Sequence, residues 1–406
     1  MRLIVLNDHG FVNGGGAQVA IASLNSLAEL GIDVTYVSSV GPIDSSINLN
    51  LVKAVNFNLY DLKSNPSKID ASITGIWNQK SLNALEILLK DFDPRETIIH
   101  LHTWVSSLTS SVVFIAHKLG FKVICTLHDY SSVCPNGGLY NFKESKNCDL
   151  TPLTFSCVCS NCDSRSYLHK IWRISRHFVQ NKLINFHEKI SLFVTVSSYS
   201  EALLRKFLPA SARFENIGNP ISIEQQNPID VGKNSNFTFI GRLSIEKGGA
   251  LFAKAAKIAN VKSVFVGSGN EEKVIKELNP DAIFMGWQNR DGVIQSISNS
   301  RAIVFPSLLH EAQPLTVLEA AAMGVPVIAS DECAAKDSII DGVTGLLFRA
   351  RDPYDLAEKL RLIDNDTELA RKLSLNAYNH YWAAPSTLEV HVDKLIKCYR
   401  NILNQE

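Results

Sequence analysis

Short apolar segments with the character of buried strands alternate with helical segments along this sequence, and the alternation runs twice. Residues 3–6, 34–38 and 97–101 belong to the first series, and residues 237–240 begin the second. A strand, a helix and another strand in succession favour parallel pairing in one sheet. The sequence therefore predicts an α/β chain with two Rossmann-like parallel-sheet domains facing a cleft.

The domain boundaries follow from the point at which the alternation restarts. We expect an N-terminal domain over residues 1–220, a C-terminal domain over residues 221–385 and a last helix over residues 386–406. A chain of 406 residues is long enough for two such domains. Residues 130–164 break the rhythm of the first domain and form a cysteine-rich insert.

Charge and hydrophobicity disfavour two classes of protein. Lys and Arg number 40, and Asp and Glu also number 40, so no overall field favours a nucleic-acid partner. The apolar run at residues 3–6 is too short for a secretion signal, and no run reaches the length of a membrane span. We therefore expect a cytoplasmic chain without a nucleic-acid partner.

Five of the eight cysteines lie in the insert. Cys159 and Cys162 have the Cys-x-x-Cys spacing of half a zinc site, and Cys134 and Cys148 would complete a tetrahedral set. In a cytoplasmic protein the alternative is reduced thiols that are occasionally oxidised. A catalytic cysteine is not expected, because no partner base stands nearby. The pattern leaves a structural zinc site and free thiols as the two interpretations.

Basic and apolar residues interleave at helical spacing over residues 165–189. One interpretation is a helix that packs its apolar face on the core and leaves its charged face in solvent. The other is attachment to an anionic membrane surface. The spacing favours the first interpretation, because core helices share this periodicity.

Two features of the first half stand where ligands gather in open α/β sheets. The glycine-rich turn at residues 13–17, with Gly15 and Gly16, would bring backbone close to a ligand or would simply make a tight turn. His102 and His128 follow the ends of predicted strands. We expect a functional role for His128, whereas His102 fits a functional and a structural role equally well.

Two cations follow the first strand of the second half. Arg242 and Lys247 stand at a strand-to-helix turn beside the backbone of Gly248. This arrangement suits a diphosphate, which Arg binds with two parallel hydrogen bonds and Lys attracts as a point charge. Surface salt bridges are the alternative, and the position at a strand end favours phosphate.

The stretch 307–324 combines a predicted helix with two carboxylates. Pro314 stands where a helix begins and Gly324 where it ends. Glu311 precedes the helix and Glu319 lies in its second turn. A helix N-terminus can bind a phosphate, so the two acids beside it indicate chemistry on a phosphorylated, hydroxyl-rich ligand. Either an acid–base pair or two ligand-positioning residues fits this pattern.

These motifs together resemble one enzyme family. The sequences Phe239-Ile-Gly-Arg242, Phe305-Pro-Ser307 and Glu311 with Glu319 are similar to those of the retaining glycosyltransferases of the GT-B fold, group 4, also called family 4. The resemblance covers nearly the whole chain. Gln18 departs from it, since many members carry Glu at this position.

The resemblance implies roles for the predicted site residues. Arg242 and Lys247 would bind the donor diphosphate and neutralise the leaving group, and Glu319 would bind the ribose hydroxyls. Glu311 would contact the transferred sugar, and His128 would lie by its anomeric carbon. The last helix would cross back to the N-terminal acceptor domain. Further implied donor contacts are Gly15, Gly16, Met285, Gln313, Pro314, Leu315 and Thr316.

The implied activity is transfer of a hexose-type sugar from a nucleotide diphosphate sugar to a glycan or lipid-linked glycan, with retention. Bacterial polysaccharide assembly, such as that of lipopolysaccharide or capsule, is the implied setting. No Asp-x-Asp motif stands near the donor residues, so we expect no cofactor in catalysis. Residues 165–189 would make a peripheral contact at the inner face of the membrane.

Other functions fit parts of the pattern. A nucleotide-sugar epimerase of the same fold would consume donor without an acceptor. A non-catalytic nucleotide-sugar-binding protein would need a broken donor site, yet Arg242, Lys247, Glu311 and Glu319 are all present. A dinucleotide oxidoreductase is disfavoured, because no clear G-x-G-x-x-G is followed by an acidic residue.

Overall fold

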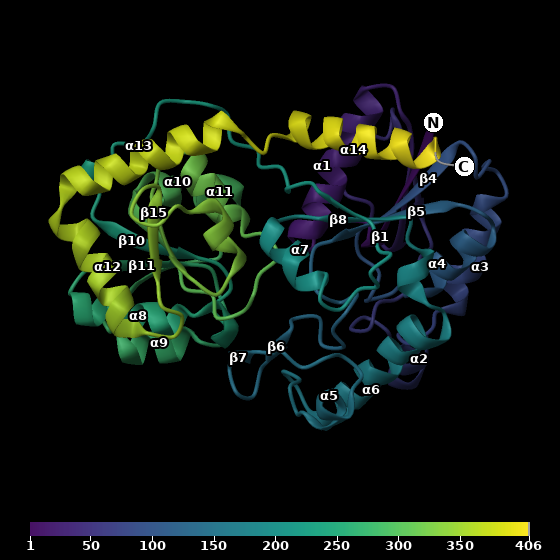
Figure 1. The fold of residues 1–406 in the computed structure, drawn as a ribbon, viewed down its shortest axis with the longest axis horizontal. Helices are drawn as coiled ribbons and strands as arrows, with labels where there is room; N and C mark the ends of the chain where they lie inside the picture. Colours follow the sequence, from purple (N-terminus) through teal and green to yellow (C-terminus); the bar gives the residue numbers. More distant parts are fainter. Residues whose placement is uncertain (405–406) are drawn as a thin grey trace. The chain divides into compact units, whose positions relative to one another are not determined.

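The computed structural model describes residues 1–404, which form two compact units (Figure 1). Within the described residues, the first unit comprises Met1–Gly138, Asp149–Pro220 and residues 388–404. The second comprises Leu139–Cys148 and Ile221–Thr387. Each contains one large parallel sheet, so the predicted α/β architecture with two parallel sheets is confirmed.

The first unit is built on a seven-stranded sheet in the order β3-β2-β1-β4-β5-β8-β9. Every residue of β1 except Arg2 is buried, as expected for a strand covered on both faces. The strand order changes direction between β1 and β4, where Leu3 pairs with both Val34 and Ile98. The strands are β1 Arg2–His9, β2 Asp33–Val40, β3 Val52–Asn56, β4 Thr97–Leu101, β5 Lys122–Leu127, β8 Leu192–Thr195 and β9 Phe214–Asn216.

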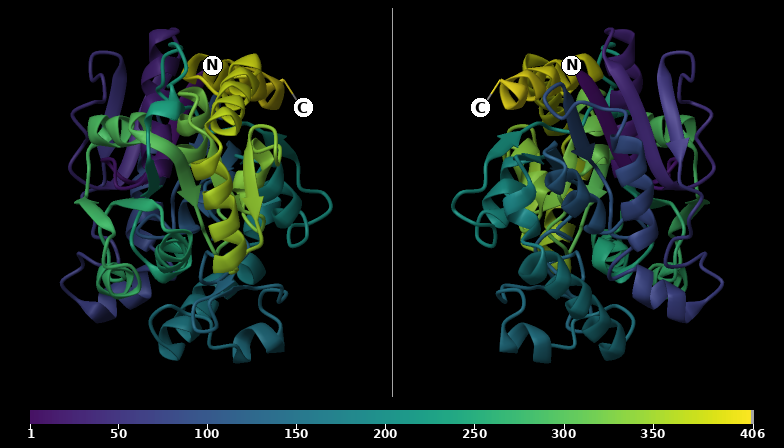
Figure 2. Two further views of the ribbon diagram at one scale, coloured as in Figure 1. Left: turned by 90° about the vertical axis from the view of Figure 1, so that its left-hand side faces the viewer. Right: turned by 90° about the vertical axis from the view of Figure 1, so that its right-hand side faces the viewer.

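The C-terminal helix α14, Leu388–Leu403, belongs to the first unit. It packs along α1 (Figure 1), and the N-terminus lies beside it in both views of Figure 2. The side chain of Tyr399 is fully buried, and its hydroxyl lies 2.7 Å from Nδ1 of His100. The other helices are α1 Gly15–Glu29, α2 Lys68–Thr74, α3 Gln79–Leu89, α4 Ser111–Lys118, α5 Phe155–Cys159, α6 Tyr167–Phe178 and α7 Ser198–Leu204, with short π and 3-10 turns at Val179–Leu183 and Phe186–Lys189.

The second unit is built on a six-stranded parallel sheet in the order β12-β11-β10-β13-β14-β15. Its core is aromatic where β11 meets α8, with the rings of Phe265 and Phe252 5.1 Å apart. The strands are β10 Asn236–Ile240, β11 Lys262–Val266, β12 Ile283–Gly286, β13 Ser300–Phe305, β14 Val327–Ser330 and β15 Gly345–Phe348. The helices are α8 Gly249–Ala259, α9 Glu272–Leu278, α10 Arg290–Ser298, α11 Leu315–Ala322, α12 Pro353–Asn365 and α13 Thr367–Ala383.

The cysteine-rich insert is divided between the two units. Its hairpin, β6 Tyr140–Asn141 and β7 Lys146–Asn147, belongs to the second unit. Nε of Arg351 donates a hydrogen bond to the carbonyl of Ser145 at 3.3 Å, and Nδ2 of Asn147 donates one to Glu332 at 3.3 Å. These polar contacts attach the hairpin to the second unit, whereas the rest of the insert stays with the first.

Helix α6 buries a different face from the one that the favoured interpretation of the sequence predicted. The residues that it buries are Lys170 and His177, whereas Leu168 is 80% exposed and Phe178 is also exposed. Its apolar residues therefore do not form a face packed on the core. Periodicity shows that a helix has two faces but does not show which face the fold buries.

No helix within residues 1–404 combines the length and the hydrophobicity that a bilayer-spanning segment requires.

Candidate active site

The candidate donor site lies where the strand order of the second sheet changes direction. The neighbouring strands β10 and β13 both end at this edge. The segment after β10 carries Arg242 and Lys247, and the segment after β13 carries Ser307 and Glu311. Ligands of open α/β sheets bind at such a switch point, so the fold brings the predicted cations and carboxylate to the expected edge.

The two segments approach each other so closely that one position requires glycine. Gly248 has φ +73°, and a Cβ there would lie 2.0 Å from the carbonyl oxygen of Pro306. No other residue can occupy this space without moving one of the segments. Gly248 therefore holds Lys247 against the segment that contains Glu311.

Lys247 and Glu311 form a partly buried ion pair. Nζ of Lys247 lies 2.6 Å from Oε1 of Glu311, and Oγ of Ser307 donates to the same oxygen at 2.8 Å. Glu311 has a left-handed backbone, with φ 48°. A non-glycine residue in this conformation is strained unless its surroundings fix it, and such residues cluster at functional sites.

Arg242 pairs with a carboxylate that sequence reasoning missed. Its Nη2 lies 3.0 Å from Oε1 of Glu246, which also accepts a hydrogen bond from Oγ of Ser244 at 2.7 Å. The side chain of Arg242 is 68% exposed. The guanidinium can therefore turn toward an anion at little cost. Residues 241–244 are not helical, so the spacing of four residues between Arg242 and Glu246 gave no reliable signal of this pair.

Glu319 is fixed by Arg290, which sequence reasoning also missed. Glu319 lies on α11 and is buried, and Nη1 of Arg290, the first residue of α10, makes a short ion pair with its Oε1. The pair joins two helices separated by a strand, so no local spacing could have revealed it. Glu319 is thus held in one position by a charged partner.

The helix predicted after Pro314 is confirmed. Pro314 is the N-cap of α11, which spans Leu315–Ala322, and Gly324 beyond it has φ +72°. The four predicted donor contacts 313–316 therefore lie at the N-terminal end of α11. The free backbone N–H groups of this end favour an anion.

A cavity of about 410 Å³ lies beside Arg242, at the ends of β10 and β11. Gly241 and Gly267 form part of its wall, and a Cβ on Gly267 would lie 2.0 Å from the carbonyl oxygen of Gly241. Met285 does not line it, although its carbonyl accepts a hydrogen bond from Nε2 of Gln288 at 2.7 Å. The lining residues are Ile240, Gly241, Arg242, Val266, Gly267, Ser268, Trp287, Gln288 and Val293.

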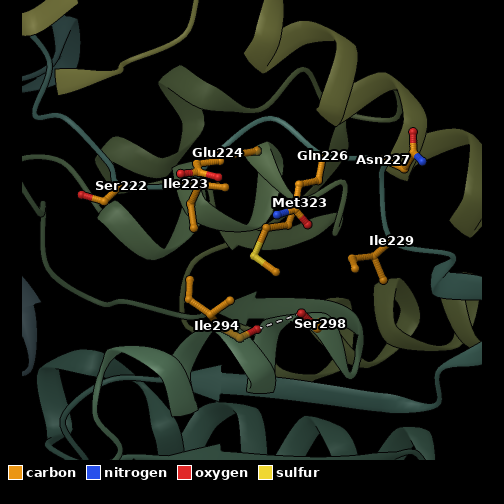
Figure 3. A pocket seen from close by; sticks show the side chains of 10 residues that line it. Ser222, Ile223, Glu224, Gln226, Asn227, Ile229, Ile294, Ser298 and Met323 are labelled. Atoms are coloured by element: carbon orange, nitrogen blue, oxygen red, sulfur yellow. Dashed lines mark hydrogen bonds between the residues drawn. The ribbon is translucent and has the colours of Figure 1, made fainter. Parts of the chain in front are cut away.

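A second cavity of about 340 Å³ lies at the other end of α11, beside Met323 (Figure 3). Ile294, Ser298, Ala322 and residues of the segment 222–229 form the rest of its wall. Its one charged lining residue is Glu224, so it offers no cation to a phosphate. The cavity beside Arg242 is the better candidate for a nucleotide diphosphate.

In the first unit, Gly16 in the first turn of α1 lies against His128, which directly follows β5. A Cβ on Gly16 would lie 3.0 Å from the ring of His128. Nε2 of His128 lies 3.0 Å from Nδ1 of His102, and the two rings stack. Burial lowers the pKa of His128 to about 4 and lowers that of His102 well below its usual value. Both rings are therefore neutral near pH 7.

Asp8 is a buried carboxylate that sequence reasoning did not single out. It lies near the end of β1 and accepts hydrogen bonds from the backbone N–H groups of Ser106, Ser107 and Leu108, at 2.8 to 2.9 Å. Burial raises the pKa of Asp8, although these hydrogen bonds oppose the shift. Asp8 thus fixes the segment after β4, which carries His102.

The four cysteines predicted as zinc ligands are not brought together. Within residues 1–404, no group of three or more His, Cys, Asp or Glu side chains is arranged to hold a metal ion. Cys148 belongs to the second unit, and Cys159 is exposed at the end of α5. Cys157 is buried instead, because helical residues two positions apart point in different directions.

Comparison with known protein families gives a match for each half of the chain. Residues 13–225 match the family described as Glycosyltransferase Family 4, and residues 222–380 match Glycosyl transferases group 1. The chain belongs to glycosyltransferase family 4. The resemblance predicted from its motifs is confirmed.

Solved structures and curated relatives agree with this family 4 assignment. The Anabaena protein Alr3699/HepE, solved in complex with UDP, superposes with a TM-score of 0.66 at 16% identity, over 99% of this chain and 100% of that one. The fold is therefore GT-B. A GDP-mannose-dependent alpha-mannosyltransferase from Corynebacterium glutamicum is 34% identical over 30% of this chain and 29% of its own length. The UDP-Gal:alpha-D-GlcNAc-diphosphoundecaprenol alpha-1,3-galactosyltransferase of Escherichia coli is 23% identical over 80% of this chain and 82% of its own.

Substitution of Gly248 tests whether its close approach to the carbonyl of Pro306 stabilises the fold. Gly248→Ala adds a steric clash with Pro306 to the cost of a left-handed backbone, so we expect a loss of unfolding free energy well above about 2 kcal/mol. Gly342→Ala is the matched control, because Gly342 has φ +72° with open space around it. It should cost only about 1–2 kcal/mol. Equal losses in urea unfolding would show that the contact with Pro306 is unimportant.

The buried histidines predict a loss of stability in acid. Unfolded histidine has a pKa of 6.5, and His128 has one of about 4 when folded. Above pH 6.5 both states are neutral. Between 6.5 and 4 the unfolded state binds a proton that the folded state does not, so stability falls, by about 2 kcal/mol at pH 5 for this group. His100, with a pKa of about 3, adds to the fall.

Urea unfolding at pH 7 and pH 5 measures this effect. His128→Gln should reduce the difference between the two pH values, and substitution of the exposed His380 should leave it unchanged. A stability that does not change between pH 7 and pH 5 would contradict the neutral, buried state of these rings.

Proposed function

We propose that the chain is a hexosyltransferase-type enzyme that transfers a sugar from a nucleotide diphosphate sugar to a glycan or lipid-linked glycan, with retention. The observation that carries the proposal is the group of Arg242, Lys247 and Glu311 at the switch point of the second sheet. Two cations and a carboxylate beside the N-terminal end of a helix suit a sugar linked to a diphosphate. Family 4 membership supports the same activity.

Arg242 and Lys247 stabilise the leaving nucleoside diphosphate in this proposal. Each cation is paired with a carboxylate in the protein, Arg242 with Glu246 and Lys247 with Glu311. A bound diphosphate replaces or shares these partners, and its negative charge grows as the bond to the sugar breaks. Cations fixed beforehand at this position stabilise the transition state without reorganising.

The two glutamates position the donor. Glu311 is held by Lys247 and Ser307 and aligns the transferred sugar through its hydroxyls. Glu319 is held by Arg290 and accepts hydrogen bonds from the ribose. Both carboxylates are already held by a cation of the protein, so the geometry favours two positioning residues over an acid–base pair.

The proposed chemistry is attack on the same face of the sugar from which the diphosphate leaves. The leaving phosphate takes the proton of the acceptor hydroxyl, and the anomeric configuration is retained. His128 of the first unit is buried and neutral near pH 7, so it does not act as a charged group in this proposal. A covalent sugar adduct on an Asp or Glu of the enzyme would contradict this step.

Names of relatives indicate which donors and acceptors to test. One relative is GDP-mannose-dependent, and another uses UDP-Gal with a diphosphoundecaprenol-linked acceptor. We propose a lipid-linked glycan acceptor and a setting in bacterial polysaccharide assembly on this basis. Catalysis proceeds without a cofactor in the proposal, so EDTA should leave turnover unchanged.

The decisive experiment screens GDP- and UDP-sugars for thermal stabilisation of the chain and then tests the binders for transfer. A ligand that binds only the folded state raises its melting temperature. Transfer to a lipid-linked acceptor with retained configuration supports the proposal. A new epimer formed without acceptor supports an epimerase, and donor binding without any turnover supports a non-catalytic protein.

Two substitutions separate the roles of the glutamates. Glu319→Ala should weaken donor binding by roughly tenfold to a hundredfold, because it removes charged hydrogen bonds worth about 1.5–3 kcal/mol. Glu311→Ala should mainly lower kcat, because the sugar is no longer aligned. Glu277→Ala, on the exposed side of α9, is the control. If both site variants lost donor binding and kcat equally, the interpretation of Glu311 and Glu319 as an acid–base pair would be favoured instead.

A surface of the first unit suits an anionic bilayer, and we propose it as the membrane contact of the enzyme. Leu168 of α6 is 80% exposed and Phe155 of α5 is 84% exposed, and Ile69 and Ile73 of α2 are also exposed. A groove of about 470 Å³ runs between α2 and α6, with Lys63, Lys68, Arg165 and His169 among its lining. Exposed apolar side chains beside cations are the combination that binds anionic lipid headgroups.

Vesicle sedimentation tests this contact. The chain should bind vesicles that contain phosphatidylglycerol and release from them at high salt, and it should bind pure phosphatidylcholine weakly. Leu168→Gln should weaken binding by roughly tenfold to a hundredfold, because a buried leucine contributes about 1.5–3 kcal/mol. Ile87→Gln, at an exposed position of α3, is the control. Vesicle binding that changes neither with the salt concentration nor in Leu168→Gln would contradict the proposal.

A further inference from the structure

Lys170 is a buried cation whose nearest partners are sulfur atoms. Its side chain on α6 is 1% exposed. Its Nζ lies 2.8 Å from Sγ of Cys162 and 3.7 Å from Sγ of Cys157. Among residues 1–404, no carboxylate forms an ion pair with it. Neither the proposed transfer reaction nor the membrane surface uses this cluster.

Sulfur atoms stabilise the buried charge of Lys170. Burial opposes the ammonium form, but the hydrogen bond to Cys162 and the nearby Cys157 and Cys134 outweigh it and raise the pKa of Lys170. An ammonium with no charged partner at this depth would cost several kcal/mol. Sγ of Cys162 is the sulfur atom closest to this ammonium. A thiolate beside a lysine is also the reactive form of cysteine.

Neighbouring residues hold the sulfur of Cys162 against the amine. Nδ2 of Asn136 donates hydrogen bonds to the carbonyl and to Sγ of Cys162, at 3.2 and 3.4 Å. The thiol of Cys134 donates to Oδ1 of the same asparagine at 3.1 Å. The next residue, Asp163, is fully buried and pairs with Arg173 of α6 at 3.2 Å. The segment before α6 is therefore fixed on the helix at the position of the nitrogen–sulfur contact.

We propose that this cluster is an oxidation site at which Lys170 and Cys162 become covalently joined through one oxygen atom. The reactants are the ammonium, the thiolate and dioxygen. One oxygen atom bonds to both nitrogen and sulfur, and the other leaves as water with two of the three ammonium hydrogens. Nitrogen and sulfur each lose two electrons, and dioxygen gains four. The product links the loop before α6 to the helix.

Mass spectrometry of the full-length chain tests the proposal. Purified protein is held under air or under argon with dithiothreitol, alkylated and digested. We expect the air sample to contain a cross-linked pair of peptides with Cys162 and Lys170, heavier than the reduced pair by one oxygen atom less two hydrogen atoms. Dithiothreitol should reverse it, since the new bond to sulfur is reducible. One of the eight thiols should disappear from a thiol titration.

Variants identify the atoms involved. Lys170→Met and Cys162→Ser should both lose the cross-link, whereas Cys159→Ser, at the exposed cysteine of the same segment, should retain it. Cys157→Ser should also retain it, because Cys157 is not one of the joined residues. The oxidised wild type should melt at a higher temperature than the reduced one, and Lys170→Met should show no such shift.

Three results would overturn the proposal. A Cys157–Cys162 disulfide, which lacks the added oxygen and persists in Lys170→Met, would assign the oxidation to two thiols. Zinc bound at one equivalent per chain, with thiols that resist alkylation, would assign the cysteines to a metal. Folded wild-type protein that stays unmodified in air would exclude the reaction.

Discussion

The donor site depends on the approach of two backbone segments that follow neighbouring strands. β10 and β13 are adjacent in the second sheet, and their helices leave the strand order in opposite directions. This leaves a crevice at the carboxyl ends. Gly248 then allows the first segment to touch the carbonyl of Pro306, at a distance that no side chain permits. Without that contact, Lys247 and Glu311 would lack a common anchor.

The charged groups around this crevice are paired in advance. Arg242 with Glu246, Lys247 with Glu311 and Arg290 with Glu319 give three cation–carboxylate pairs in one unit. A bare group of cations would repel itself and lower the stability of the fold. Pairing keeps the site nearly neutral while it is empty. It also fixes the orientation that a diphosphate sugar would meet, so that binding costs little reorganisation.

Much of the fold and part of the site could be predicted from the sequence. Buried apolar runs identify the strands, and Pro314 and Gly324 delimit α11, because these signals are local. Arg290 could not be assigned to Glu319, since their contact depends on how two helices pack. The cysteine pattern suggested Cys159 as a ligand, but the helical phase of α5 buries Cys157. The burial of Lys170 in α6 is likewise a tertiary effect, set by the sulfur atoms that surround it.

Neither unit is a continuous stretch of chain, and this has a consequence for synthesis. The backbone passes between the units four times, at the hairpin 139–148, at Pro220 and at Leu388. His100 in the first sheet meets Tyr399, 299 residues later. The sheet of the first unit can form early on the ribosome, but the part of its face that α14 covers stays exposed until α14 emerges. During that interval its apolar side chains are open to aggregation or to chaperones. The first unit can therefore be completed only after α14 has been translated.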